Sequence, residues 1–268
     1  MNDESIKKYM KNYIETKMKL EVNQIDIIST YPIVDAPGWV VHFLSIRVKV
    51  KIGNEYQSAI VNKTIFTKGN RITVNLMKKG ELRRDGLRRG KSRSYTELLK
   101  PSVPIDAYDD AHFLLGNKNA PHKILIFSDP YCPYCKKKAV EVVNMVKANS
   151  NTYGLYYYHL PLLKIHPAAD VTTRAMHIFH KKGEIDKMMK LYTLPIKAKE
   201  TDVDKILKAI KAKTGVLFTK KQIFSPEIKE AMRVDMAMKR RLQVTGTPTI
   251  FLDGKWDRLR KEYKKYAK

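Results

Sequence analysis

The two cysteines of the chain lie close together, after an apolar run and at the start of a helical pattern. The run Ile124–Phe127 has the length and composition of a buried strand, and the next four residues are typical of a turn. Apolar residues then recur at the spacing of an amphipathic helix, at Cys135, Ala139, Val142, Val143 and Val146. The pattern places a Cys-x-x-Cys pair, Cys132 and Cys135, where a strand passes into a helix.

This placement gives the two thiols different chemistry. At a helix start, unpaired backbone N–H groups and the helix dipole stabilise an anion, so we expect a lowered pKa for Cys132. The run Lys136–Lys138 adds positive potential nearby. Cys135 follows on the same face, placed to attack a mixed disulfide formed at Cys132. The spacing predicts a thioredoxin-like redox site with Cys132 as nucleophile and Cys135 as resolving thiol, rather than two buried unreactive cysteines.

A second motif lies far downstream, at Thr245-Gly246-Thr247-Pro248-Thr249. A proline that starts a strand cannot donate to the sheet, and a cis bond before proline usually marks a tight turn. In thioredoxin-like folds this loop packs against the Cys-x-x-Cys pair, and the backbone before the proline can pair with a substrate strand. We therefore expect Thr247 and Pro248 to bind substrate.

The remaining pattern predicts two folded parts. In residues 1–80, a helix over Glu4–Lys19 and four strand-like stretches indicate an α+β unit with a role in binding or assembly. Glycines and prolines in 81–111 indicate a linker. In 112–268 the order is strand, helix, strand, a helical insertion over about 165–241, a final strand and a closing helix over Arg258–Lys268, which is an α/β order.

Composition excludes several classes of protein. With 268 residues and 43% apolar content the chain suits a globular protein, without a membrane-spanning run or a signal peptide as written. The protein is then either cytoplasmic or the mature form of an exported one. Two cysteines exclude a disulfide scaffold and disfavour a zinc site, because the spacing of His159 and His166 does not indicate further ligands. We expect no metal and no cofactor.

Basic residues are in excess and give a formal charge of +25. The densest cluster comprises Arg83, Arg84, Arg88, Arg89, Lys91 and Arg93. A nucleic-acid binder would need a recognisable module beside such a patch, and the sequence contains none. We interpret the excess as a solvated basic surface and expect no nucleic-acid partner.

Both motifs carry a resemblance to a known family. Phe127-Ser-Asp-Pro-Tyr-Cys-Pro-Tyr-Cys135 and Thr245-Gly-Thr-Pro248 resemble the DsbC/DsbG family of periplasmic thiol–disulfide interchange proteins, DsbG more closely, and the lead-in His112–Pro121 is similar too. The resemblance implies a cystatin-like N-terminal dimerisation domain, a linker and a catalytic thioredoxin domain. It also implies a periplasmic homodimer whose cleft holds misfolded or disulfide-containing proteins, with Cys132, Cys135, Thr247 and Pro248 as the functional set.

The direction of disulfide exchange stays open. The hypothesis that we favour is a disulfide isomerase or reductase that acts on protein substrates and that a membrane redox partner resets. The alternatives are an oxidase on the same scaffold and a chaperone-like clamp. Thioredoxins keep a buried acid six residues before the first cysteine, where this chain has Ile126. Asp129 lies closer to the motif, and we interpret it as a turn residue rather than a base.

Overall fold

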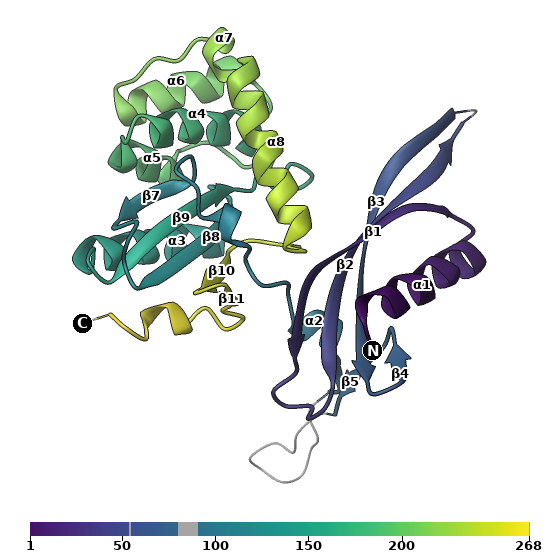
Figure 1. The fold of residues 1–268 in the computed structure, drawn as a ribbon. Coiled ribbons are helices and arrows are strands. Elements are labelled where there is room, and N and C mark those ends of the chain that lie inside the picture. The colour runs from purple at the N-terminus through teal and green to yellow at the C-terminus, as the bar shows by residue number, and fades with distance from the viewer. Residues whose placement is uncertain (54, 80–90, 268) are drawn as a thin grey trace. The chain divides into compact units, whose positions relative to one another are not determined.

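The computed structural model describes residues 1–53, 55–79 and 91–267, which form two compact units, Met1–Ser102 and Val103–Lys268 (Figure 1). In the part of the chain so described, no helix is both long and apolar enough to cross a membrane. Each unit has its own hydrophobic core.

The first unit is a helix packed on an antiparallel sheet. Helix α1 (Asp3–Tyr13) begins at Asn2, whose side chain accepts the Ser5 N–H, and a π-helical turn over Ile14–Met18 extends it. Strands β1 (Glu21–Pro32), β2 (Val40–Ile52), β3 (Glu55–Lys68) and β4 (Arg71–Thr73) pair in chain order. The buried core between helix and sheet comprises Ile6, Met10, Ile14, Val22, Leu44, Ile46, Val48 and Ile65. The predicted helix and antiparallel sheet are confirmed.

The residues of the expected linker divide between the two units. Strands β5 (Met77–Lys78) and β6 (Arg93–Ser94) pair, and the short helix α2 (Tyr95–Leu98) follows in the first unit. Tyr95 is buried against Phe66, so this stretch packs on the first sheet. A 3-10 turn at Ile105–Ala107 belongs to the second unit. Most of the basic cluster, in 80–90, lies outside the described residues. The division at 80 and 111 stays a prediction.

The second unit contains a five-stranded mixed sheet. Its strands are β7 (Phe113–Gly116), β8 (His122–Ser128), β9 (Tyr153–His159), β10 (Thr249–Leu252) and β11 (Lys255–Trp256), in the order β11-β10-β8-β9-β7. Strands β8 and β9 are parallel, and helix α3 (Pro133–Ala148) connects them; the other pairs are antiparallel. The three predicted strands, β8, β9 and β10, are confirmed, whereas β7 and β11 were not predicted.

Alternate residues of β8 build two cores. Ile124 and Ile126 join the core that contains the buried face of α3, while Leu125 and Phe127 join the core on the opposite side with Tyr158. The strand is buried on both faces, which explains why it is a continuous apolar run in the sequence.

Five helices lie between β9 and β10, so the predicted helical insertion is confirmed (Figure 1). They are α4 (Ala169–Lys181), α5 (Ile185–Lys190), α6 (Val203–Thr214), α7 (Lys220–Ile223) and α8 (Pro226–Arg241). In Figure 1, α4 to α7 gather beyond one end of the sheet, and α8 runs back toward it.

The predicted closing helix is wrong. Among the described residues of this segment the one helical element is a 3-10 turn at Glu262–Lys264, because the buried Asp257 carboxylate accepts the N–H groups of Lys261 and Tyr263 and fixes a tighter turn. Tyr263 is fully buried, so one aromatic side chain, not a helical stripe, anchors this end of the chain.

Candidate active site

Cys132 and Cys135 lie where β8 passes into α3, as predicted. Cys132 occupies the N-cap position of α3 with an extended backbone (φ −66°, ψ 121°), and Pro133 begins the helix, where its missing N–H does no harm. Both thiols are free. Cys132 is 6% exposed and Cys135 0%, so an incoming sulfur atom reaches Cys132 first. Tyr134, between them, is 71% exposed.

Hydrogen bonds make Cys132 acidic. The Cys135 side chain is the largest cause, and with the backbone N–H groups of the helix start and the Thr247 side chain it lowers the pKa of Cys132 to about 5, against the opposing effect of burial. A thiolate at Cys132 is therefore the stable form near neutral pH. The lowered pKa expected from the helix start is present.

Cys135 has the opposite tendency. Burial raises the pKa of Cys135 far above its usual value, and its contact with Cys132 raises it further. The Ser128 and Thr247 side chains act against this rise. The pair thus divides into an acidic sulfur that is slightly exposed, Cys132, and a fully buried sulfur that holds its proton in the reduced protein, Cys135.

Lys138, the last of the three lysines after the motif, has partners of its own. Lys138 points to the Glu141 carboxylate at 2.9 Å and to the Tyr263 hydroxyl at 3.2 Å. Its charge is compensated there, and hydrogen bonds account for the acidity of Cys132.

The structure brings the distant Thr247-Pro248 loop to the cysteines. The bond between Thr247 and Pro248 is cis, and Pro248 is buried at the start of β10. In its thiol form Cys132 donates to the Thr247 carbonyl oxygen, 3.3 Å away. The Thr247 hydroxyl is buried and has no hydrogen-bond partner among the described residues, but it contributes to the pKa of both cysteines. All four residues selected from the sequence therefore form one site.

Asp129 holds the loop that carries Cys132. It is fully buried, and its Oδ1 accepts the Tyr131 N–H at 2.7 Å, an Asx turn. Its Oδ2 accepts the Leu162 N–H at 2.7 Å and the His166 Nδ1 at 3.0 Å, which ties the loop to the segment after β9. The interpretation of Asp129 as a turn residue is confirmed, and the sequence did not reveal its link to His166.

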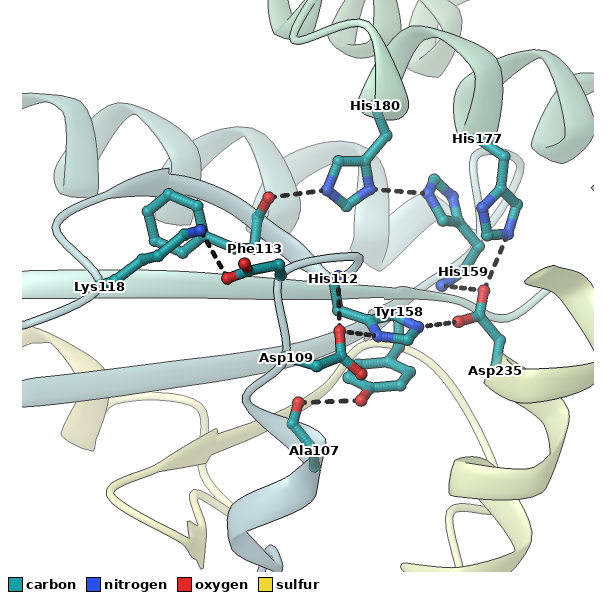
Figure 2. A network of polar contacts seen from close by, with 11 residues as sticks. Ala107, Asp109, His112, Phe113, Lys118, Tyr158, His159, His177, His180 and Asp235 are labelled. Carbon is teal, nitrogen blue, oxygen red and sulfur yellow. Dashed lines mark hydrogen bonds and ion pairs between the residues drawn. The ribbon is translucent and has the colours of Figure 1, made fainter.

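A second buried polar cluster joins the insertion to the sheet (Figure 2). Asp235, on α8, accepts from His112 Nε2 at 2.9 Å and from the His159 backbone N–H at 3.0 Å, and it lies 2.9 Å from His177 Nε2. His112 also faces Asp109, at 2.7 Å from its Nδ1. Burial alone lowers the pKa of His112, but the two carboxylates outweigh it and the pKa is raised.

Two other histidines of this cluster, His159 and His180, stay neutral. His180 donates from Nε2 to the Phe113 carbonyl at 3.1 Å, and its Nδ1 lies 3.4 Å from His159 Nε2 (Figure 2). Burial lowers the pKa of His180 to about 4 and that of His159 well below its usual value. These contacts hold α4 and α8 against the end of β9.

The sequence contains one signal for this buried cluster of Asp235 and histidines. Asp235 lies on the same helical stripe as the buried Ile228 and Met232, and an acid at such a position needs buried partners. His159 and His166, considered above as zinc ligands, point instead to His180 and Asp129. Among the described residues, no group of three or more His, Cys, Asp or Glu side chains is arranged to hold a metal ion.

Comparison with known proteins places this site in a family. A family model described as Thioredoxin matches residues 109–267. The probable disulfide bond formation protein D of Bacillus anthracis is 28% identical over 152 residues, which cover 52% of this chain and 69% of that protein. The protein of the same name from Bacillus cereus is 26% identical over the same length and shares of both chains.

A solved structure shares the fold. The oxidised form of BdbD from Bacillus subtilis is 16% identical, with a TM-score of 0.50, and the match covers 62% of this chain and 92% of that one. The family model spans more than half of the chain, including both cysteines and the Thr247-Pro248 loop. The chain therefore belongs to the thioredoxin family, and it is a thiol–disulfide oxidoreductase with Cys132-Pro-Tyr-Cys135 as its redox pair.

Proposed function

We propose that this protein oxidises protein substrates by donating its Cys132–Cys135 disulfide, the second of the hypotheses that the sequence left open. The observation that carries the proposal is the pKa of Cys132, lowered to about 5 chiefly by the Cys135 side chain. A stabilised thiolate favours the reduced form of the protein and so makes its disulfide a strong oxidant. The two Bacillus relatives are probable disulfide bond formation proteins, which supports the same direction.

The exchange proceeds in two steps. A substrate thiolate attacks Cys132 Sγ in the protein disulfide, so the new bond joins substrate and Cys132 and the sulfur of Cys135 leaves as a thiolate that takes up a proton. A second substrate thiolate then attacks the substrate sulfur, and Cys132 leaves as a thiolate. Two substrate thiols are oxidised to a disulfide and the protein pair is reduced. A membrane redox partner would reoxidise the pair.

Thr247 and Pro248 are the proposed substrate-binding residues. The Thr247 carbonyl lies 3.3 Å from Cys132 Sγ, so a substrate strand that hydrogen-bonds to it places its own sulfur beside Cys132. Cys132 carries no proton in the disulfide or as a thiolate, so in both forms this carbonyl is available to accept a substrate N–H.

The isomerase or reductase of the first hypothesis is the second candidate. The observation that favours it is the separate N-terminal unit, whose long strand β1 lies at the edge of its sheet. Such an edge suits pairing with a second copy. In this version residues 1–80 are a cystatin-like dimerisation domain, 81–111 a linker and 112–268 the catalytic domain. The periplasmic homodimer and its chaperone-like cleft belong to this proposal.

The redox state of Cys132 and Cys135 in cells that produce the protein distinguishes an oxidase from an isomerase or reductase. Cells are quenched in acid, free thiols are alkylated with a heavy maleimide, and the protein is resolved by gel shift. We expect the pair to be mostly oxidised. The Cys132→Ala variant has one thiol and marks the gel position of singly alkylated protein. A mostly reduced pair would overturn the oxidase proposal and select the isomerase or reductase. Sedimentation at micromolar concentration tests the homodimer, and a monomer would remove it.

A further inference from the structure

An arginine from the end of the chain lies beside the redox motif. Tyr134, two residues after Cys132 in the first turn of α3, has an exposed side chain. The guanidinium carbon of Arg260 is 6.0 Å from the centroid of the Tyr134 ring, the distance of a cation–π contact. The guanidinium therefore lies close to the surface from which a substrate sulfur reaches Cys132.

The backbone holds Arg260 in this place. Its φ is +56°, in the left-handed region that few residues other than glycine adopt, and such constrained positions gather at functional sites. The Arg260 N–H donates to the carbonyl of the buried Asp257 at 3.0 Å, and the Asp257 N–H donates to the Ile250 carbonyl at 2.9 Å. Ile250 belongs to β10, the strand that begins after Thr247-Pro248. Arg260 is thus fixed to the strand next to the substrate loop and, through Tyr134, to α3.

The acids close to this turn are already engaged. Both oxygens of the Asp257 carboxylate accept backbone N–H groups. Glu141, the one acid of α3, is paired with two lysines, Lys138 and Lys264. Within the part of the chain that the structure describes, Arg260 forms no ion pair. Its charge is therefore free to meet a carboxylate from outside the protein.

The start of α3 adds charge of the same sign. Lys136 and Lys137 are exposed, and the first turn of the helix contains no acid. The Lys136 ammonium lies 6.0 Å from the centroid of the Tyr131 ring, and neither lysine forms an ion pair among the described residues. Arg260, Lys136 and Lys137 together form a basic rim, whose complement is an acidic segment.

From this geometry we infer that Arg260 is a specificity-determining residue that binds an acidic side chain next to the reactive cysteine of a protein substrate. Tyr134 is a positioning residue that holds the guanidinium, whose fork of N–H donors matches a carboxylate. A substrate strand on the Thr247 carbonyl advances about 3.3 Å per residue, so the neighbours of its cysteine extend toward the rim. The inference rests on the proposed function, because it needs a protein substrate that reacts at Cys132.

Three peptides test this preference. Each has two cysteines, and they differ only in the residues on both sides of the first cysteine, which are Glu, Gln or Lys. The full-length oxidised protein is mixed with each peptide, and the second-order rate of peptide oxidation is divided by the thiolate fraction of that peptide. The result compared is the ratio of the Glu to the Gln rate, in which a change of the protein's own redox potential cancels.

We expect wild type to oxidise the Glu peptide roughly fivefold faster than the Gln peptide at low ionic strength, the size of one partly exposed ion pair. The ratio should decrease with added salt, and the Lys peptide should be the slowest. Arg260→Gln should bring the ratio below about twofold, and Arg260→Lys should restore part of it because the charge returns without the fork. Tyr134→Leu should lower the ratio in the same sense.

Arg258→Gln is the matched control. It removes the same charge from an exposed arginine two positions earlier, for which the described residues show no contact with an aromatic ring. The control should keep the wild-type ratio. An equal fall in Arg258→Gln, or equal rates for the Glu and Gln peptides in wild type, would overturn the inference.

Failure of the proposed function would look different. Wild type would then oxidise none of the peptides, the Gln peptide included, and the inference would fall with it. A wild type that oxidises the Gln peptide but shows no preference for Glu would remove the inference alone.

Discussion

The sulfur of Cys132 lies 3.3 Å from the carbonyl oxygen of Thr247, although 115 positions separate the two residues in the chain. The contact joins the start of α3 to the loop before β10, so the reactive thiol and the backbone that would hold a substrate form one surface. As a thiol Cys132 donates to this oxygen, and as a thiolate it cannot. The ionisation of Cys132 and the availability of the Thr247 carbonyl are therefore linked.

The first prediction concerns that ionisation. The ultraviolet absorbance of the thiolate in the reduced protein should titrate with a midpoint near pH 5, the pKa of Cys132 set mainly by the Cys135 side chain. In Cys135→Ala the midpoint should rise, because the largest stabilising hydrogen bond is lost. Cys132→Ala should show no transition below pH 8 or so, the range of an ordinary cysteine. A midpoint that stays in place in Cys135→Ala would contradict this account.

The second prediction concerns Asp129. Asp129→Asn should lower the free energy of unfolding by roughly 2–3 kcal/mol, because an amide cannot accept from all three donors and leaves a buried N–H unpaired. Denaturant titration measures the change. Asp186→Asn, which removes an exposed partner of Lys147, is the control and should cause no measurable change. Equal stability of the two variants would show that the loop is not held through Asp129.

The third prediction concerns stability in acid. Burial lowers the pKa of His180 to about 4, against 6.5 in the unfolded chain, so between these values the unfolded state binds the extra proton. Stability should therefore fall as the pH decreases from 6.5 toward 4, by about 2 kcal/mol at pH 5 for this residue, and level off below 4. The lowered pKa of His159 also reduces stability as the pH decreases. The raised pKa of His112 has a different effect: its contribution to stability is complete below pH 6.5 and is lost as the pH rises through the pKa of the folded protein.

Denaturant titrations of wild type and His180→Gln at several pH values check this, since glutamine keeps a donor toward the Phe113 carbonyl. The variant should lose less stability between pH 6.5 and 5 than the wild type. If wild type and variant lost the same stability over this pH range, groups other than His180 would cause the acid sensitivity.

The fourth prediction concerns Gly116 at the end of β7. Its φ is +92°, and an added Cβ would lie 2.1 Å from the Tyr153 carbonyl oxygen, a backbone atom in the neighbouring strand. Gly116→Ala should destabilise the protein by roughly 3 kcal/mol, since backbone strain and a clash combine. Gly183→Ala, with φ +68° and open space around it, should cost about 1 kcal/mol from strain alone. Thermal or denaturant unfolding compares the two, and similar values would contradict the clash.

The sequence predicted those parts of the site that local pattern determines. The apolar run of β8, the stripe of α3 and the proline before β10 each have a short-range signature, and together they placed Cys132, Cys135, Thr247 and Pro248. Tyr192 and Asp235 could not be placed in the same way. Their partners lie on other elements, Ser128 and Tyr157 for the first and His112 and His159 for the second, and only the folded insertion brings them together.

The same reasoning explains the errors. The closing helix was predicted from polar composition at 258–268, but the buried Asp257 and Tyr263 decide that segment through tertiary contacts. Strands β7 and β11 have two to four residues, too few for an alternating pattern to appear.

The helical insertion contacts the strand that leads to the redox pair, although the two are far apart in the sequence. Tyr192, whose hydroxyl hydrogen-bonds to Ser128 at the end of β8, is 57 residues beyond Cys135 in the chain, and Asp235 of the insertion accepts the His159 N–H at the end of β9. A minimal thioredoxin scaffold carrying Cys132-Pro-Tyr-Cys135 without the insertion would therefore keep the helix start and lose the hydrogen bonds of Tyr192 that join β8 and β9 to the insertion.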